Sequence, residues 1–81
     1  MSDLQLLRQP AVRNLYPFGR SQLYSNIKQG LFVKPVRLGA RASAWPRREV
    51  EEICRALIAG KGDAELRDLV KTLEAARTAA A

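Results

Sequence analysis

Apolar residues recur at helical spacing most clearly between residues 46 and 59. The spacing there is i, i+3, i+4, i+7 and i+8, which places the apolar side chains on one face of a helix. These positions are Val50, Ile53, Cys54, Leu57 and Ile58. The pattern predicts a helix that begins at Pro46, runs to about residue 59 and buries this face.

Two shorter helices are expected before it. Pro10 suits the first turn of a helix and Pro17 disfavours helical backbone before it, so a helix is predicted over residues 9–16, with Val12 and Leu15 facing inward. A tight turn through Phe18 and Gly19 then leads into a second helix. Together the pair forms a helix-turn-helix pattern.

The second helix is predicted to begin with Arg20 or Ser21 as its cap and to close at Gly30. Leu23 and Ile27 lie four residues apart and are expected to face inward. The opposite, outward face would then carry polar side chains: Gln22, Ser25, Asn26 and Gln29.

The segment after Gly30 changes character. A loose alternation of apolar and basic residues in "FVKPVRL", a glycine turn and then "ASAW" predict a two-stranded hairpin with Arg41 near its tip. Trp45 is expected to anchor this hairpin to the core. The predicted fold class is therefore mainly α with a small two-stranded β wing, a winged helix-turn-helix over residues 1–59.

A fourth helix is predicted over residues 63–77, with Asp63 as its cap and residues 78–81 as a frayed tail. Its apolar stripe is narrow and lacks repeated heptads. Packing on its own domain is favoured, and contact with a partner is the alternative. The stripe consists of Leu66, Leu69, Val70 and Leu73.

The composition excludes several classes of protein. The chain has 81 residues, no apolar run of the roughly 18 residues that span a bilayer, and no recognisable secretory signal. Its single cysteine, Cys54, is expected to be buried and inert, and a cytoplasmic location is expected. The sequence has no histidine, no glycine-rich phosphate loop and no zinc ligand set. Neither an enzyme nor a cofactor or metal site is therefore predicted.

The net charge of +6 is unevenly distributed along the chain. Between Asp3 and Glu49 there is no acidic residue. One-signed charge over half a domain repels itself, and it is typical of proteins that meet a polyanion. A surface that is basic only for solubility is the alternative. The basic residues of this segment are Arg8, Arg13, Arg20, Lys28, Lys34, Arg37, Arg41, Arg47 and Arg48.

Duplex DNA is the polyanion that the helix-turn-helix pattern favours. In a major groove, the amides of Gln22 and Asn26 could pair with adenine edges and Arg20 with guanine. Arg37 and Arg41 of the hairpin could lie against phosphates or in the minor groove. The alternative is an ordinary solvated helix face and an ordinary basic turn.

Arg47 and Arg48 also favour a partner that carries phosphates. Cations in the first turn of a helix oppose the helix dipole by a few tenths of a kcal/mol each, and an external phosphate would convert that penalty into a binding contribution. Acidic neighbours such as Glu49 partly relieve it, so a purely structural role is also open.

The motifs "GRSQLYSNIKQGLFVKPVRLGARASAW" and "REVEEI" resemble the AlpA family of phage- and prophage-associated regulators, which is related to MerR-like winged helix-turn-helix domains and to phage excisionases. The resemblance covers roughly residues 6–59. Ser25 and Asn26 depart from the pattern, which has a basic and an apolar residue there. The residues that match are Leu7-Arg8, Arg20-Ser21, Tyr24, Ile27-Lys28, Gly30, Lys34 to Gly39, Trp45 and Glu49-Val50.

The resemblance implies a MerR-like domain that binds double-stranded DNA, with the second helix in the major groove and the wing beside it. It makes Arg20, Ser21, Gln22 and Ser25 candidate groove contacts, together with Asn26 from the outward face. The candidate backbone or wing contacts are Tyr24, Lys28, Lys34, Arg37, Arg41, Arg47 and Arg48.

The predicted function is a sequence-specific transcriptional regulator linked to a prophage or mobile element and located at the bacterial nucleoid. The alternatives are an excisionase-like factor that bends attachment-site DNA, and a basic protein-interaction module. The expected partners are duplex DNA, further copies of the chain as a dimer or cooperative array, and RNA polymerase or an integrase. No membrane partner is expected.

Overall fold

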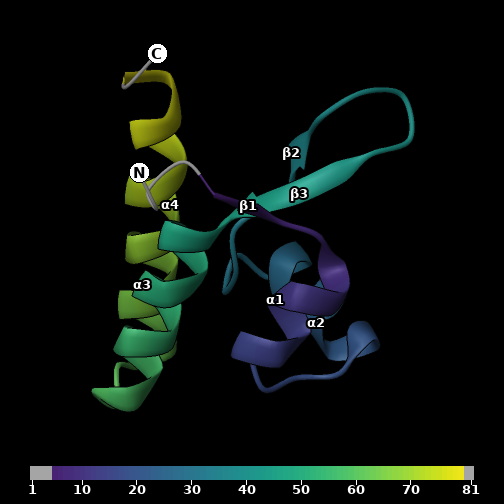
Figure 1. Ribbon diagram of the computed structural model, residues 1–81. Helices are drawn as coiled ribbons and strands as arrows, with labels where there is room; N and C mark the ends of the chain where they lie inside the picture. Colours follow the sequence, from purple (N-terminus) through teal and green to yellow (C-terminus); the bar gives the residue numbers. More distant parts are fainter. Residues whose placement is uncertain (1–4, 80–81) are drawn as a thin grey trace.

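The computed structural model describes residues 5–79, and Figure 1 shows their arrangement. In chain order these residues form β1 (Leu6–Leu7), α1 (Gln9–Leu15), α2 (Arg20–Lys28), β2 (Val36–Arg37), β3 (Ser43–Pro46), α3 (Arg47–Ile58) and α4 (Asp63–Ala79). Helices α3 and α4 lie side by side, and the β2–β3 hairpin projects away from them (Figure 1). The predicted fold class is confirmed.

The sheet has one strand more than the sequence pattern predicts. Its order is β1-β3-β2, with β3 antiparallel to both neighbours. In the wing, Val36 pairs with Ala44 and the Leu38 N–H donates to the Ala42 carbonyl, so Arg41 lies in the tip as expected. The missed strand, β1, is only two residues long, which is too short for an alternating pattern.

The helix boundaries largely follow the expected signals. Pro10 lies in the first turn of α1, and the helix ends before Pro17. The caps differ from the prediction: α2 begins after Gly19 with no side-chain cap, so neither Arg20 nor Ser21 caps it. Helix α4 likewise begins at Asp63 itself, and the Gly62 carbonyl accepts its first backbone hydrogen bond.

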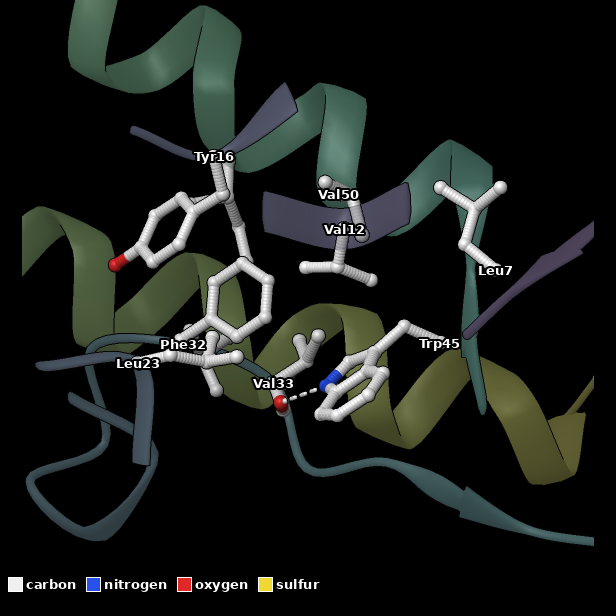
Figure 2. Packing of buried hydrophobic residues seen from close by; sticks show 10 residues of the cluster. Leu7, Val12, Tyr16, Leu23, Phe32, Val33, Trp45 and Val50 are labelled. Carbon is white, nitrogen blue, oxygen red and sulfur yellow. Dashed lines mark hydrogen bonds between the residues drawn. The ribbon is translucent and has the colours of Figure 1, made fainter. Parts of the chain in front are cut away.

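The core lies where the helices meet β3. Trp45 is 1% exposed and its indole N–H donates to the Val33 carbonyl at 3.0 Å, as Figure 2 shows, so its predicted anchoring role is confirmed. Each fully buried aliphatic or aromatic side chain contributes about 1.5–3 kcal/mol relative to an exposed one. The main cluster consists of Leu7, Val12, Tyr16, Leu23, Phe32, Val33, Trp45, Val50, Ile53 and Val70.

Two residues predicted to be buried lie at the surface. Leu15 is 39% exposed and Ile58 is 86% exposed, because each is the last residue of its helix and lies beyond the packed turns. Cys54, which lines the same hollow as these two residues, is half-buried rather than buried.

Helix α4 packs on its own domain. Leu66 and Val70 are buried, and Leu69 and Leu73 pack against the core cluster. The stripe therefore packs within the domain, as the favoured interpretation expects, and a partner contact through it stays a prediction. The helix continues through Ala79, two residues beyond the predicted end, and residues 80–81 of the predicted tail lie outside the described residues.

Candidate nucleic-acid interface

A basic hollow lies between the first turns of α1 and α2 and the wing. Its volume is about 570 Å³, far more than the roughly 30 Å³ that one water molecule occupies. Three of its residues are arginines, from three separate elements or loops, and none of the described residues that line it is acidic. The lining residues are Arg8, Gln9, Pro10, Arg20, Tyr24, Arg41, Ser43 and Trp45.

The start of α2 adds backbone donors beside this hollow. Gly19 occupies the N-cap position and no side chain accepts from the first turn. The first N–H groups of a helix have no acceptor within the helix, and the helix dipole makes this end positive. Arg20 therefore lies at the end of α2 that attracts an anion.

Tyr24 is held at the wall of the hollow by two neighbours. Its ring lies edge-on to Trp45 with centroids 6.4 Å apart, and its hydroxyl oxygen is 3.4 Å from Nε2 of Gln9, which donates to it. Tyr24 is 44% exposed. The core tryptophan thus positions a surface phenol next to Arg20 and Arg41.

The outward face of α2 carries most of the polar residues that were expected there. Ser21, Gln22, Ser25 and Lys28 are exposed, and Gln29 donates from Nε2 to the Ser25 hydroxyl at 3.0 Å. The expectation that Asn26 faces outward is wrong. Asn26 is 6% exposed, because it lies three residues after the buried Leu23 on the inward side of α2.

Asn26 is satisfied by two side chains. Its Nδ2 donates to the Tyr16 hydroxyl at 2.7 Å, and its Oδ1 accepts from Nε2 of Gln22 at 2.7 Å. Burial raises the pKa of Tyr16 above its usual range, and the hydrogen bond from Asn26 only partly offsets this. The hydroxyl is therefore protonated and neutral at physiological pH.

The base of the wing is fixed by α4. The Lys34 N–H donates to Glu74 Oε2 at 2.8 Å, and the Lys34 carbonyl accepts from Arg77 Nη2 at 2.7 Å. Both bonds use the backbone of Lys34, and its side chain is exposed. Arg37 and Arg41, farther along the wing, are also exposed. Sequence reasoning missed this attachment, because the residues are about 40 positions apart.

Arg77 also forms an ion pair with Glu49 on α3. The Arg77 Nε lies 3.0 Å from Glu49 Oε2, and Glu49 is only 7% exposed. Glu49 lies four residues before the buried Ile53, so its place on the inward flank of α3 is readable from the sequence. Its partner, Arg77, cannot be identified from the sequence in the same way, because it lies 28 positions away on α4.

The two arginines that begin α3 differ. Arg47 donates to Glu51 at 2.9 Å and to Oε1 of Gln5 at 2.9 Å, so its charge is already paired within the protein. Arg48 is exposed. Of the two, Arg48 is the better placed to meet an external phosphate.

The described residues contain no group of three or more His, Cys, Asp or Glu side chains that could hold a metal ion. Cys54 has its Sγ 3.3 Å from the Leu15 carbonyl oxygen. Burial, and secondarily the charge of Glu51, raises the pKa of this thiol, which keeps it in the poorly nucleophilic protonated form at neutral pH. Within residues 5–79, no helix has the length and apolar character needed to cross a membrane.

The sequence model of the family described as "Prophage CP4-57 regulatory protein (AlpA)" matches residues 5–55. This range includes the hollow, α2, the wing and most of α3, and it excludes α4. No curated protein and no solved structure matches the chain.

Proposed function

The chain belongs to the AlpA family of prophage regulatory proteins, and from this premise we propose that it binds duplex DNA sequence-specifically and regulates transcription. The observation that carries the proposal is the hollow between α1, α2 and the wing. It brings together Arg8, Arg20 and Arg41, which are distant in sequence, with no acidic residue among its described lining. A polyanion is the partner that such a surface fits.

In the proposed complex, α2 enters the major groove. The exposed side chains of Ser21, Gln22 and Ser25 then face base edges, and Arg20 is placed to pair with guanine. The wing follows the duplex backbone, with Arg37 and Arg41 against phosphates.

The contacts to α4 support this arrangement, because they hold the wing relative to α2. The backbone of Lys34, at the base of the wing, is bound by Glu74 and Arg77. The Arg67 Nε donates to the Gln29 carbonyl at 2.9 Å, at the end of α2. One helix therefore secures both DNA-facing elements.

The test is selection from a random duplex pool with competing nonspecific DNA at near-physiological salt. We expect a defined motif to be enriched. Arg41→Ala should weaken binding about equally for all sequences, whereas Arg20→Ala should also relax the preference at one position by about 1–3 kcal/mol. Arg55→Ala is the matched control, because Arg55 is an exposed arginine on α3 away from the hollow. Binding of both hollow variants at the wild-type level would refute the proposed surface.

The shape of the bound DNA distinguishes an excisionase-like role of the same surface from the proposed role in transcription. A factor of that type bends attachment-site DNA for an integrase, so it should select repeated, closely spaced sites and bend them beyond about 40°. A lone site without bending favours the transcriptional role.

In the rival protein-interaction role, the α4 stripe would be the binding surface. Leu69 packs against the core, so a charged residue there would report on folding instead.

A further inference from the structure

A short chain of side-chain hydrogen bonds runs from the core to the surface of α2. The Tyr16 hydroxyl accepts from Nδ2 of Asn26, and Oδ1 of Asn26 accepts from Nε2 of Gln22, both at 2.7 Å. Tyr16 is 2% exposed, Asn26 is 6% exposed and Gln22 is exposed. The chain therefore ends on a side chain that the proposed function places against DNA.

The inner end of this chain cannot move easily. The Tyr16 ring stacks on Phe32 with centroids 4.2 Å apart and contacts Phe18 at 4.7 Å. Figure 2 shows this ring among the core side chains, with its hydroxyl oxygen at the edge of the cluster. Asn26 is confined beside it, because its buried amide would lose both hydrogen bonds if the side chain turned away from Tyr16 and Gln22.

The hydrogen bond to Asn26 also restricts the side chain of Gln22. It lies one helical turn before Asn26 on the same flank of α2, so its amide can reach Asn26 without strain. A free glutamine loses several rotamers when it binds a base, which costs affinity. Here the bond to Asn26 has already selected the rotamer in the free protein.

The bond also determines which hydrogen-bond donors and acceptors of Gln22 remain available to a DNA base. An amide carries two N–H donors and one carbonyl acceptor. One N–H is used by Asn26, so one N–H and Oε1 remain. In the major groove adenine presents an acceptor, N7, beside a donor, the N6 amino group.

We propose that Gln22 is a pre-oriented reader of adenine, and that Tyr16 and Asn26 are its positioning residues. This inference rests on the proposed function and names one base of the site. The direction of the hydrogen bonds is essential to it. If Asn26 donated to Gln22 instead, Gln22 would be left with two donors, and these match N7 and O6 of guanine.

The experiment repeats the duplex selection with wild type, Gln22→Ala and Tyr16→Phe. Wild type should select adenine at one position of its motif. Gln22→Ala should lower that preference roughly 5- to 150-fold, the range for one bidentate amide–adenine pair. Tyr16→Phe retains the ring and removes the anchor, so it should weaken the preference at the same position and leave affinity for nonspecific DNA unchanged.

Gln29→Ala is the matched control, because Gln29 is an exposed amide just after the end of α2 whose side chain donates to the exposed Ser25 and makes no bond to the Tyr16–Asn26 pair. It should leave that adenine preference at the wild-type value. Gln22 is exposed, so its alanine variant reports on recognition even where Tyr16→Phe impairs folding.

The outcomes separate this inference from the proposed function. A wild-type protein that selects no motif refutes both. A defined motif that is insensitive to Gln22→Ala overturns the inference and leaves the function intact. Guanine at the Gln22-dependent position, or a folded Tyr16→Phe with unchanged base preference, also overturns the inference.

Discussion

At the scale of single residues, polar side chains at inward positions distinguish this chain. Asn26 and Glu49 are both more than nine-tenths buried, and each has a partner from another helix or loop, Tyr16 for Asn26 and Arg77 for Glu49. Among the described residues, no buried side-chain nitrogen or oxygen lacks a hydrogen-bond partner. Such groups contribute little net stability when paired, but they are costly when one partner is removed.

The Glu49–Arg77 pair gives a prediction at this scale. Arg77→Ala should lower the free energy of unfolding by about 3–5 kcal/mol, because it leaves the Glu49 carboxylate buried without its partner and also removes the bond to the Lys34 carbonyl. Urea unfolding followed by the fluorescence of Trp45, the single tryptophan, measures the change.

The control for this prediction is Arg55→Ala. Arg55 pairs with Glu52, but both side chains are well exposed, so the loss should stay below about 1 kcal/mol. Equal effects of the two substitutions would show that burial of Glu49 does not decide the energy of its ion pair.

At the scale of elements, two helices end in the same way. Gly30 and Gly60 have φ angles of 80° and 78°, and in each case the N–H of the following residue donates to a carbonyl five residues earlier in the helix. These are Schellman motifs, which satisfy the last carbonyls and turn the chain sharply. Gly60 thereby directs the chain from α3 into α4.

Substitution of this glycine yields the second prediction. A Cβ at Gly60 would meet no atom within 4 Å, so the cost of Gly60→Ala is conformational and should be about 1 kcal/mol. Gly39→Ala is the control, since Gly39 also has open space around it but no positive φ. Thermal unfolding should show a lower Tm for Gly60→Ala only, and equal shifts would contradict the role of the left-handed backbone.

At the scale of the whole molecule, charge is segregated by element. The segment without acidic residues forms α1, α2 and the wing, whereas all acidic residues from Glu49 onward lie on α3 and α4. Because α3 and α4 lie side by side and the hairpin projects away from them (Figure 1), the acidic residues of the described chain lie on one part of the fold, and α1, α2 and the wing carry basic residues alone. A DNA duplex would therefore contact the side formed by α1, α2 and the wing.

The salt dependence of DNA binding tests this arrangement. The three arginines of the hollow alone predict a slope of log K against log salt of about −2.7, and Lys28 and Arg37 in addition would make it about −4.5. Arg8→Ala should reduce the magnitude of the slope by about 1. Lys61→Ala, at an exposed lysine between α3 and α4, should leave the slope unchanged. An equal change in both variants would place the DNA elsewhere.

The sequence by itself determined the order and type of the helices, the hairpin and the charge asymmetry. Each of these depends on local signals: the spacing of Val50 and Ile53, the prolines at 10 and 17, the glycine at 30, and the absence of acids over one continuous segment. The basic residues of the candidate surface were predictable for the same reason, because arginine and lysine side chains are rarely buried.

The tertiary structure alone decided which residues meet. Helix spacing places Asn26 and Glu49 toward the interior, but their polar groups are satisfied there only because Tyr16, ten residues before Asn26, and Arg77 of α4 supply partners. Strand β1 exists only because β3 offers it a partner. Pairing of buried polar groups and of short strands is a contact between distant positions, and no local spacing encodes it. The gathering of Arg8, Arg20 and Arg41 around one hollow has the same origin.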